Sequence, residues 1–514
     1  MNLYNQLFPL PNSWLLILAL MCAIISIFLS YKNKHTAAIC VLFISAFILR
    51  LFAAHLDPFL NEWDEEFHAL VARNMMHDPL KPMLRVSDML QYDYKEWCCN
   101  HIWLHKQPLF LWQMALSMKL FGVSEYAIRY PAVLMGSIGV LLVYRISFLM
   151  TGDKHISFIA ALLACFSYYQ LTLVSGREGM DQNDCAFDFY VLCSIWAYAE
   201  YRTKKTLKYA LLIGLFAGCA VLNKWLIGLL VFPAWGIIIL MSIGMPEGRR
   251  ELLHCMLAIL TCIIVFMPWQ LYILHTFPVE ASYEFEFNSK HLFNIVEGHS
   301  GTTWYYLDFF PDYFGHYLYY FLFAGLIICI IYKKYRNTLS VSALILFIVT
   351  FLFFSFIAAT KVHAYFTVVA ALGYIFIAIA LYEVLLMLRA KRYLFIPCAI
   401  TAALLIFNLA QITNDHDIRN SKMFSSMKYN TDIYKKFHEM APSTIKVALN
   451  VKNYVNFMFY NNDVDAYSWV PSADDIARFK NKHYPIAVFI EPGATVPRDL
   501  TNYEPLYVIQ MHLK

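Results

Sequence analysis

The chain has 514 residues, of which 60% are hydrophobic and 15% are charged, and its formal net charge is +4. A typical soluble domain has about a quarter of its residues charged, so this composition excludes an ordinary soluble protein. A net charge this small gives no indication of a nucleic-acid partner.

Apolar runs of about 20 residues recur along the chain, and each is long enough to cross a bilayer as a helix. They predict an α-helical polytopic membrane protein with about 12 to 13 transmembrane helices. The predicted spans are residues 13–31, 36–54, 127–149, 156–175, 185–200, 208–222, 225–243, 253–274, 317–332, 340–358, 364–388 and 393–411.

Lysine and arginine indicate the orientation, because cytoplasmic loops collect them. Basic clusters occur at every second connection, beginning with Lys32 and Lys34 and ending with Arg389, Lys391 and Arg392. The connections between them are therefore expected to be external, provided that residues 108–121 lie in the interface or dip in and out. The predicted external segments are residues 55–126, 176–184, 222–225, 275–316, 359–363 and the tail from 412.

The first helix is expected to be an anchor with its N-terminus outside. Residues 1–13 contain no lysine or arginine, whereas a secretory signal begins with a basic region.

The tail after residue 411 is polar and predicts a small external α/β domain at 412–514, following a transmembrane domain at 1–411. Its strand-like runs are 446–451, 465–469, 486–491 and 506–511, and its helix-like runs are 454–460 and 473–481. Ser472 precedes Asp474 and Asp475, which is typical of the start of a helix.

Charged side chains gather in the predicted external loops. Asp64 and Glu65 follow a membrane span, and Lys106 lies in the same loop. Lys361 stands between two apolar helices, where a charge is costly and normally has a use. Cations on the side of a membrane that is usually poor in them need a reason, and binding a lipid phosphate at the outer leaflet is one.

A sugar carried on a polyprenyl phosphate would suit such a site. Its leaving group is a phosphate, whose developing charge cations can stabilise. The acceptor hydroxyl needs a base, and a carboxylate can serve. The sequence contains no glycine-rich phosphate loop of a nucleotide-binding fold.

Seven segments, in this order, resemble the GT-C glycosyltransferases, in the branch of the protein O-mannosyltransferases and the transferases that add aminoarabinose to lipid A. The segments are WDEEFHALVARNM at 63–75, HKQPLFLW at 105–112, KLFGVSE at 119–125, RYPA at 129–132, GCAVLNK at 218–224, PW at 268–269 and TKVHAY at 360–365.

This resemblance implies a GT-C fold with a catalytic external loop at about 55–126 and a large external loop at about 275–316. It implies an inverting glycosyltransferase that moves a sugar from a polyprenyl-phosphate donor to a lipid, glycan or protein acceptor. The expected location is the bacterial inner membrane, with the active site and the tail on the periplasmic side. No cofactor is expected to be required.

The resemblance also implies residue roles. Asp64 matches the acidic position assigned as catalytic, and Glu65 stands beside it. The expected donor phosphate-binding residues are Lys106, Lys224, Lys361 and Arg177. The expected substrate-binding residues are His105, His68, Asp181, Lys290, His291 and Tyr365, and no metal site is expected. The lipid A branch usually has a glutamate where this chain has His105. This difference bears on which donor and acceptor the protein uses more than on the type of reaction.

Other interpretations stay open at this point. A transporter or lipid flippase would place charges near the membrane midplane and show inverted repeats, neither of which is evident. A structural scaffold would leave the loop charges unexplained. Arg73 is equally suited to pair with the carboxylates or to contact a ligand, and Glu66 suits a structural or solvated role.

Overall fold

The computed structural model describes residues 12–87, 89–96, 100–177, 182–387 and 423–514. The chain divides into two compact units. The helical unit contains Met1–Leu56 and Tyr130–Asn414, and the α/β unit contains Asp57–Arg129 and Asp415–Lys514.

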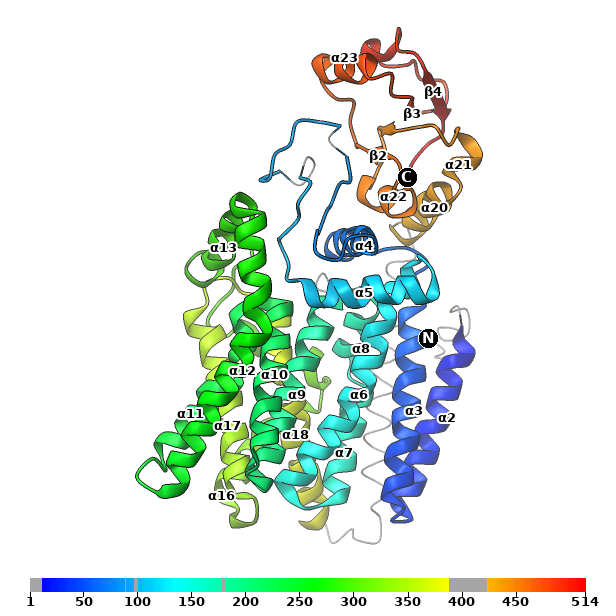
Figure 1. The fold of residues 1–514 in the computed structure, drawn as a ribbon. Helices are drawn as coiled ribbons and strands as arrows, with labels where there is room; N and C mark the ends of the chain where they lie inside the picture. The colour runs from blue at the N-terminus through cyan, green and yellow to red at the C-terminus, as the bar shows by residue number, and fades with distance from the viewer. Residues whose placement is uncertain (1–11, 88, 97–99, 178–181, 388–422) are drawn as a thin grey trace. The chain divides into compact units, whose positions relative to one another are not determined.

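The helical unit is a bundle of helices joined mostly by short turns (Figure 1). Its main elements are α2 (Ser13–Tyr31), α3 (His35–Ala54), α6 (Glu125–Thr151), α7 (Lys154–Cys165), α8 (Tyr168–Val174), α9 (Gln182–Lys204), α10 (Leu207–Lys224), η1 (Trp225–Leu229), α11 (Val231–Leu240), α12 (Pro246–Thr276), α13 (Pro278–Phe293), α14 (Tyr305–Asp308), α15 (Phe310–Phe314), α16 (Tyr319–Ile331), η2 (Lys333–Tyr335), α17 (Thr338–Leu352), η3 (Phe353–Ile357), η4 (His363–Val369) and α18 (Ala370–Met387).

Seven helices in the described part of the chain are long and apolar enough to cross a membrane, or eight if the bent pair α7–α8 is one span. Helices satisfy their own backbone hydrogen bonds, which a bilayer interior requires. The fold class predicted from the sequence, a polytopic helical membrane protein, is confirmed. The predicted span at 393–411 lies outside the described residues.

Small residues let the helices approach closely. Gly214 and Gly218 in α10 face α12, where a Cβ on either glycine would overlap a backbone carbonyl oxygen, that of Ala258 or of Cys262. Ser45 in α3 donates to the Ala19 carbonyl oxygen of α2 at 2.7 Å. Such contacts drive association in membranes, where burial of apolar surface gives little advantage over lipid.

The predicted span at 156–175 is broken. The axes of α7 and α8 differ by 46°. At the break, the Arg50 guanidinium of α3 donates to the carbonyl oxygens of Ala164 at 3.0 Å and Cys165 at 3.2 Å. Arg50 therefore satisfies carbonyls at the end of α7 from a neighbouring helix.

The α/β unit contains a four-stranded parallel sheet in the order β2-β1-β3-β4. The elements are α4 (Asp64–Met75), α5 (Pro108–Phe121), α20 (Met423–Lys435), α21 (Phe437–Met440), β1 (Val447–Leu449), α22 (Tyr454–Tyr460), β2 (Asp465–Ala466), α23 (Ala473–Asn481), β3 (Ile486–Ile490), η6 (Arg498–Leu500) and β4 (Leu506–Gln510). Helices α4 and α5 of this unit come from the first loop, and α20, α21, α22 and α23 come from the tail. The segment 108–121, which was predicted to lie in the interface or to dip in and out, forms α5.

Each strand lies within a run predicted from the sequence, and α22 and α23 have the predicted bounds. Ser472 caps α23, because its hydroxyl accepts a hydrogen bond from the Asp475 backbone N–H. Helix α20 was not predicted.

Residues of the first polar loop bind the tail within the α/β unit. The Arg85 guanidinium lies 3.2 Å from the Asp465 carboxylate, with both side chains buried. Lys435 lies 2.9 Å from the Glu125 carboxylate, which also accepts a hydrogen bond from the Tyr460 hydroxyl at 3.0 Å. The loop and the tail are therefore parts of one compact body.

Candidate active site

Asp64 and Lys106 form a partly exposed ion pair in the α/β unit. Asp64 is the first residue of α4, where the helix dipole favours a carboxylate. The Lys106 Nζ lies 3.9 Å from Asp64 Oδ2, and the two side chains are 22% and 21% exposed. A reactant can therefore reach a negative and a positive group at the same point.

Glu65, the next residue after Asp64, is held by Arg129. Its carboxylate oxygens each lie 2.8 Å from an Arg129 nitrogen, and the exposed fractions are 1% for Glu65 and 0% for Arg129. The Asn61 backbone N–H donates to the same carboxylate at 2.7 Å. Two parallel charge-assisted hydrogen bonds fix geometry as well as charge. Glu65 is thus positioned by the protein.

Arg129 also binds the backbone of the loop that leads into α4. It donates to the carbonyl oxygens of Asp57 and Phe59, each at 2.7 Å. One side chain therefore connects the start of the loop to the first turn of α4. This arrangement limits the movement of Asp64, the neighbour of Glu65.

Trp63 stands just before Asp64 in an unfavourable backbone conformation. Its φ is 67° and its ψ is −116°, although it is not glycine and its side chain is 71% exposed. A conformation of this kind costs about 1–3 kcal/mol and is often found at functional sites. The strain lies at the residue that sets the direction in which α4 begins.

Two histidines named from the sequence are buried in the α/β unit. His68 is fully buried, with its ring centroid 4.8 Å from that of Phe110 and 5.7 Å from that of Trp103. His105 is 8% exposed and lies 5.6 Å from the Trp103 ring centroid. The aromatic surroundings of His68 favour a packing role over contact with a substrate.

Glu66 is buried, and no cation of the described residues forms an ion pair with it. Its Oε1 has no hydrogen-bond partner among the described residues. Burial, followed by the neighbouring Glu62 and Glu65 carboxylates, raises the pKa of Glu66 well above its ordinary value of 4.5. Because burial disfavours the charged form, the protonated acid is favoured.

Arg73 binds residues of the tail rather than the Glu65 carboxylate. Its guanidinium donates to the Phe459 carbonyl oxygen and, at 3.0 Å, to Asn462 Oδ1. It therefore joins α4 to α22 and its following turn. The partner of the Glu65 carboxylate is Arg129, not Arg73.

A second cluster lies in the helical unit. Lys224, the last residue of α10, forms an ion pair with Asp184 in the first turn of α9. The Lys224 ammonium also lies 4.8 Å from the ring centroid of Tyr365 in η4. Two residues named from the sequence, Lys224 and Tyr365, are therefore in contact, and Asp184 holds the lysine.

Lys361 binds the protein's own backbone. Its ammonium donates to the carbonyl oxygen of Phe354 and, at 2.8 Å, to that of Ser355, at the end of the α17–η3 helix. Burial lowers the pKa of Lys361. A donor phosphate could bind this ammonium only in exchange for these carbonyls or beside them.

The remaining candidates differ in their surroundings. Lys290 forms an exposed ion pair with Glu286 at 2.8 Å on α13. The next residue, His291, packs edge-on against Phe287 with 5.4 Å between ring centroids. Arg177 is half-buried, and Asp181 lies outside the described residues. In the part of the chain that the structure describes, no three His, Cys, Asp or Glu side chains are placed to hold a metal ion.

Sequence reasoning did not assign roles to Arg129 and Asp184. Both carried a signal, since Arg129 begins the RYPA segment and Asp184 is one of the charges in the second external loop. Their partners could not be inferred, because Glu65 is 64 residues from Arg129 and Asp184 is 40 residues from Lys224.

Comparison with known proteins identifies glycosyltransferases as similar to this chain. The family of dolichyl-phosphate-mannose-protein mannosyltransferases matches residues 105–272. An undecaprenyl phosphate-alpha-4-amino-4-deoxy-L-arabinose arabinosyl transferase from Photorhabdus laumondii is 26% identical over 203 residues, which are 38% of this chain and 35% of that protein. Its counterpart from an Enterobacter species is 27% identical over 205 residues, 38% of this chain and 36% of that protein.

The matched part of the chain spans about a third of the length of these curated relatives. Solved structures extend the comparison to the whole fold. The crystal structure of ArnT from Cupriavidus metallidurans bound to undecaprenyl phosphate has a TM-score of 0.63 at 15% identity, covering 86% of this chain and 88% of that one. The fold is that of the GT-C glycosyltransferases. The apo structure of the same protein agrees, with a TM-score of 0.65 over 86% of this chain and 91% of that one.

The GT-C resemblance found in the sequence is therefore confirmed. The family match begins at His105 and includes Lys106, Lys224 and Pro268. It ends before Lys361, and Asp64 precedes it. At this identity the structural likeness concerns the fold, so the roles of individual residues stay predictions.

Proposed function

We propose that this protein is an inverting glycosyltransferase that moves a sugar from a polyprenyl phosphate to a lipid, glycan or protein acceptor. The observation that carries the proposal is the Asp64–Lys106 pair, with its 3.9 Å separation and partial exposure, on a GT-C fold. The named relatives act with undecaprenyl phosphate-linked aminoarabinose, which supports a donor of this class.

The reaction needs one base and one cation. Asp64 takes the proton of the acceptor hydroxyl as the oxygen attacks the anomeric carbon. The bond from the anomeric carbon to the phosphate oxygen breaks on the opposite face, so the configuration inverts. The bonding electrons leave with the phosphate, whose added charge Lys106 stabilises. No cofactor enters these steps.

Glu65 is proposed to position Asp64 rather than to take the proton itself. Because Arg129 neutralises its charge and holds both of its oxygens, Glu65 is less available than Asp64 to take a proton. Its part is to fix the first turn of α4. The catalytic role therefore rests mainly on Asp64.

The other proposed roles rest on the sequence match. Lys224, Lys361 and Arg177 are assigned to the donor phosphate, and the Asp184 pair is expected to orient Lys224. Tyr365, His105, Lys290, His291, His68 and Asp181 are assigned to substrate binding. Each assignment is separately testable by substitution.

The role of Lys106 is tested by Lys106→Ala, with Lys95→Ala as the control, since Lys95 is an exposed lysine of the same loop. We expect the Lys106 variant to need a higher donor concentration for half-maximal transfer. Lys106→Arg should restore binding only partly, because a planar guanidinium does not replace a compact ammonium. Unchanged donor affinity in Lys106→Ala would remove this residue from the donor site.

The site and the 412–514 domain are proposed to lie on the periplasmic side of a bacterial inner membrane. In the helical unit, the α2–α3 and α11–α12 turns lie at the same end of the bundle (Figure 1), and both are near basic residues. Cytoplasmic ends collect such residues.

Orientation is tested with single cysteines introduced at Ser443 and Lys208, both exposed, in a variant whose 12 native cysteines are replaced by serine or alanine. A membrane-impermeant thiol reagent applied to intact spheroplasts should label Ser443→Cys and spare Lys208→Cys. The reverse pattern would contradict the orientation.

A further inference from the structure

The order in which the chain adds strands to the sheet of the α/β unit reverses between β1 and β3. From β1 the chain passes through α22 to β2 on one side, and from β3 it passes through η6 to β4 on the other. In open parallel sheets, ligands bind outside the carboxyl ends of the strands at the point where the order reverses. This rule selects the ends of β1 and β3.

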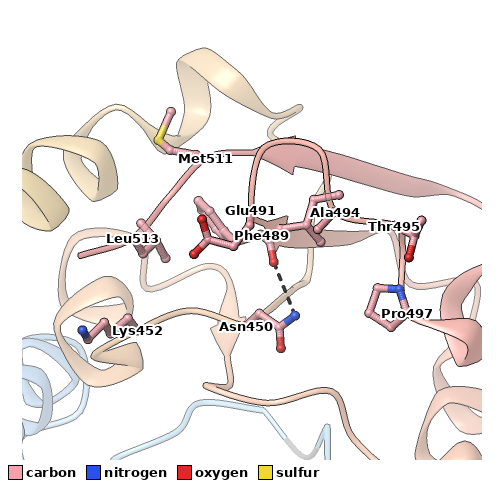
Figure 2. Close-up of a pocket in the computed structure, with 10 residues that line it drawn as sticks. Asn450, Lys452, Phe489, Glu491, Ala494, Thr495, Pro497, Met511 and Leu513 are labelled. Carbon is pink, nitrogen blue, oxygen red and sulfur yellow. Dashed lines mark hydrogen bonds between the residues drawn. The ribbon is translucent and has the colours of Figure 1, made fainter.

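A pocket of about 320 Å³ occupies this place (Figure 2). Asn450 directly follows β1, Glu491 directly follows β3, and Met511 directly follows β4. The volume is at the lower end of the range for small-molecule pockets, about 300–1,000 Å³. The topology and the cavity therefore agree on one location.

The ends of β1 and β3 are joined across the pocket floor. The Asn450 side-chain amide donates to the Phe489 carbonyl oxygen at 3.4 Å. Asn450 has a φ of 56°, a conformation that asparagine tolerates better than most residues. Glu491 pairs with His512, whose Nδ1 lies 2.6 Å from the carboxylate, and both side chains are exposed. Two polar side chains thus lie beside the opening.

The rest of the lining combines a hydroxyl with apolar surface. Thr495 and Pro497 come from the loop after β3, and Met511 and Leu513 come from the segment after β4. In Figure 2, Leu513 and Pro497 lie on opposite sides of Asn450. Lys452 balances the charge of Glu491, so the lining favours a ligand without net charge.

We propose that this pocket binds a saccharide. A sugar presents hydroxyls that an amide, a carboxylate and a threonine can bind, and C–H faces that proline, methionine and leucine can cover. The lining offers a phosphate one ammonium beside one carboxylate and so no net positive charge, and neither Asn450 nor Lys452 belongs to a glycine-rich loop. The proposal rests on the strand order and on the pocket lining, and it does not depend on the transferase reaction.

Saturation-transfer NMR tests this binding with the full chain in lipid nanodiscs, which avoids detergents with sugar headgroups. The probes are methyl glucoside, methyl mannoside, methyl galactoside and N-acetylglucosamine, each up to about 10 mM, which detects millimolar affinity. Inorganic phosphate, followed by ³¹P line width, is the comparison ligand. At least one saccharide should give saturable transfer, and phosphate should not compete with it.

Matched variants locate the site. Thr495→Val and Glu491→Gln should each weaken saccharide binding about three- to tenfold, the usual effect of one lost hydrogen bond. Thr444→Val and Glu439→Gln make the same changes at exposed positions outside the pocket and should have no effect. Asp64→Asn should bind the saccharide normally, which separates this site from the proposed transferase chemistry.

Three results would overturn the proposal. They are the absence of transfer to every saccharide, displacement of the saccharide by phosphate, and equal binding by the pocket variants and their controls.

Discussion

Arg129 encloses Glu65 in a buried two-point ion pair and at the same time binds the carbonyl oxygens of Asp57 and Phe59. The arginine therefore connects three successive parts of one segment: the loop, the turn after it and the first turn of α4. Asp64, the proposed base, is the residue before Glu65 in the chain. The precision of the site is expected to depend on this contact.

Loss of the Arg129–Glu65 ion pair should destabilise the protein strongly. Arg129→Gln leaves a carboxylate buried without its cation, which typically costs about 3–5 kcal/mol. Thermal unfolding of the purified protein measures the effect. Arg478→Gln, which breaks an exposed ion pair with Asp475, is the control and should change little.

A double variant separates the interaction energy of the pair from the effect on stability of losing either side chain. Glu65→Gln together with Arg129→Gln should be more stable than Arg129→Gln alone, because no buried charge is then left unpaired. Strictly additive losses would show that the two residues act independently.

The raised pKa of Glu66 predicts a pH dependence of stability. The folded state binds this proton more tightly than the unfolded state, so the contribution is complete below pH 4.5 and is lost as the pH rises through the raised pKa. Glu66→Gln resembles the protonated acid and has no such loss. The variant should therefore gain stability over the parent at neutral pH, and the gain should shrink toward pH 4.5.

Unfolding temperatures of the two proteins across this pH range provide the measurement. Glu96→Gln is the control, because Glu96 is an exposed carboxylate of the same loop and is not among the groups that raise the pKa of Glu66. Parallel pH profiles for the parent and Glu66→Gln would mean that Glu66 is charged in the folded protein.

The contact between the α10 glycines and α12 predicts that a larger side chain at these positions is not tolerated. Gly214→Val should destabilise the helical unit by at least about 1–3 kcal/mol, because the added side chain meets the α12 backbone. A Cβ on Gly236 of α11 meets nothing within 4 Å, so Gly236→Val is the matched control. Yield of folded protein and unfolding temperature report both. Equal behaviour of the two variants would show that α10 and α12 do not pack as described.

Composition and periodicity were enough to predict the helical bundle and the strands of the tail. Apolar runs of membrane length and short strand-like runs such as 486–491 are properties of neighbouring residues, which a sequence displays directly. The break between α7 and α8 could not be predicted. It depends on Arg50, more than a hundred residues away, which binds the carbonyls released at the break.

The candidate site was predictable to the same degree. The sequence places Asp64 and Lys106 in one loop, and the fold brings them to 3.9 Å. The burial of His68, the binding of Lys361 to backbone carbonyls and the Glu65–Arg129 pair all require three-dimensional packing. Side-chain type therefore suggested the chemistry, whereas the environment of each group needed the structure.

The measurement that tests the central claim most directly is transfer of sugar from a polyprenyl-phosphate donor by purified Asp64→Asn. The substitution keeps the shape and removes the charge, and Asp93→Asn in the same loop is the control. The account predicts a folded protein that binds the donor normally and turns over about 10²–10⁴-fold more slowly, while the control is unaffected. Near-normal turnover by Asp64→Asn would contradict the assignment of Asp64 as the base.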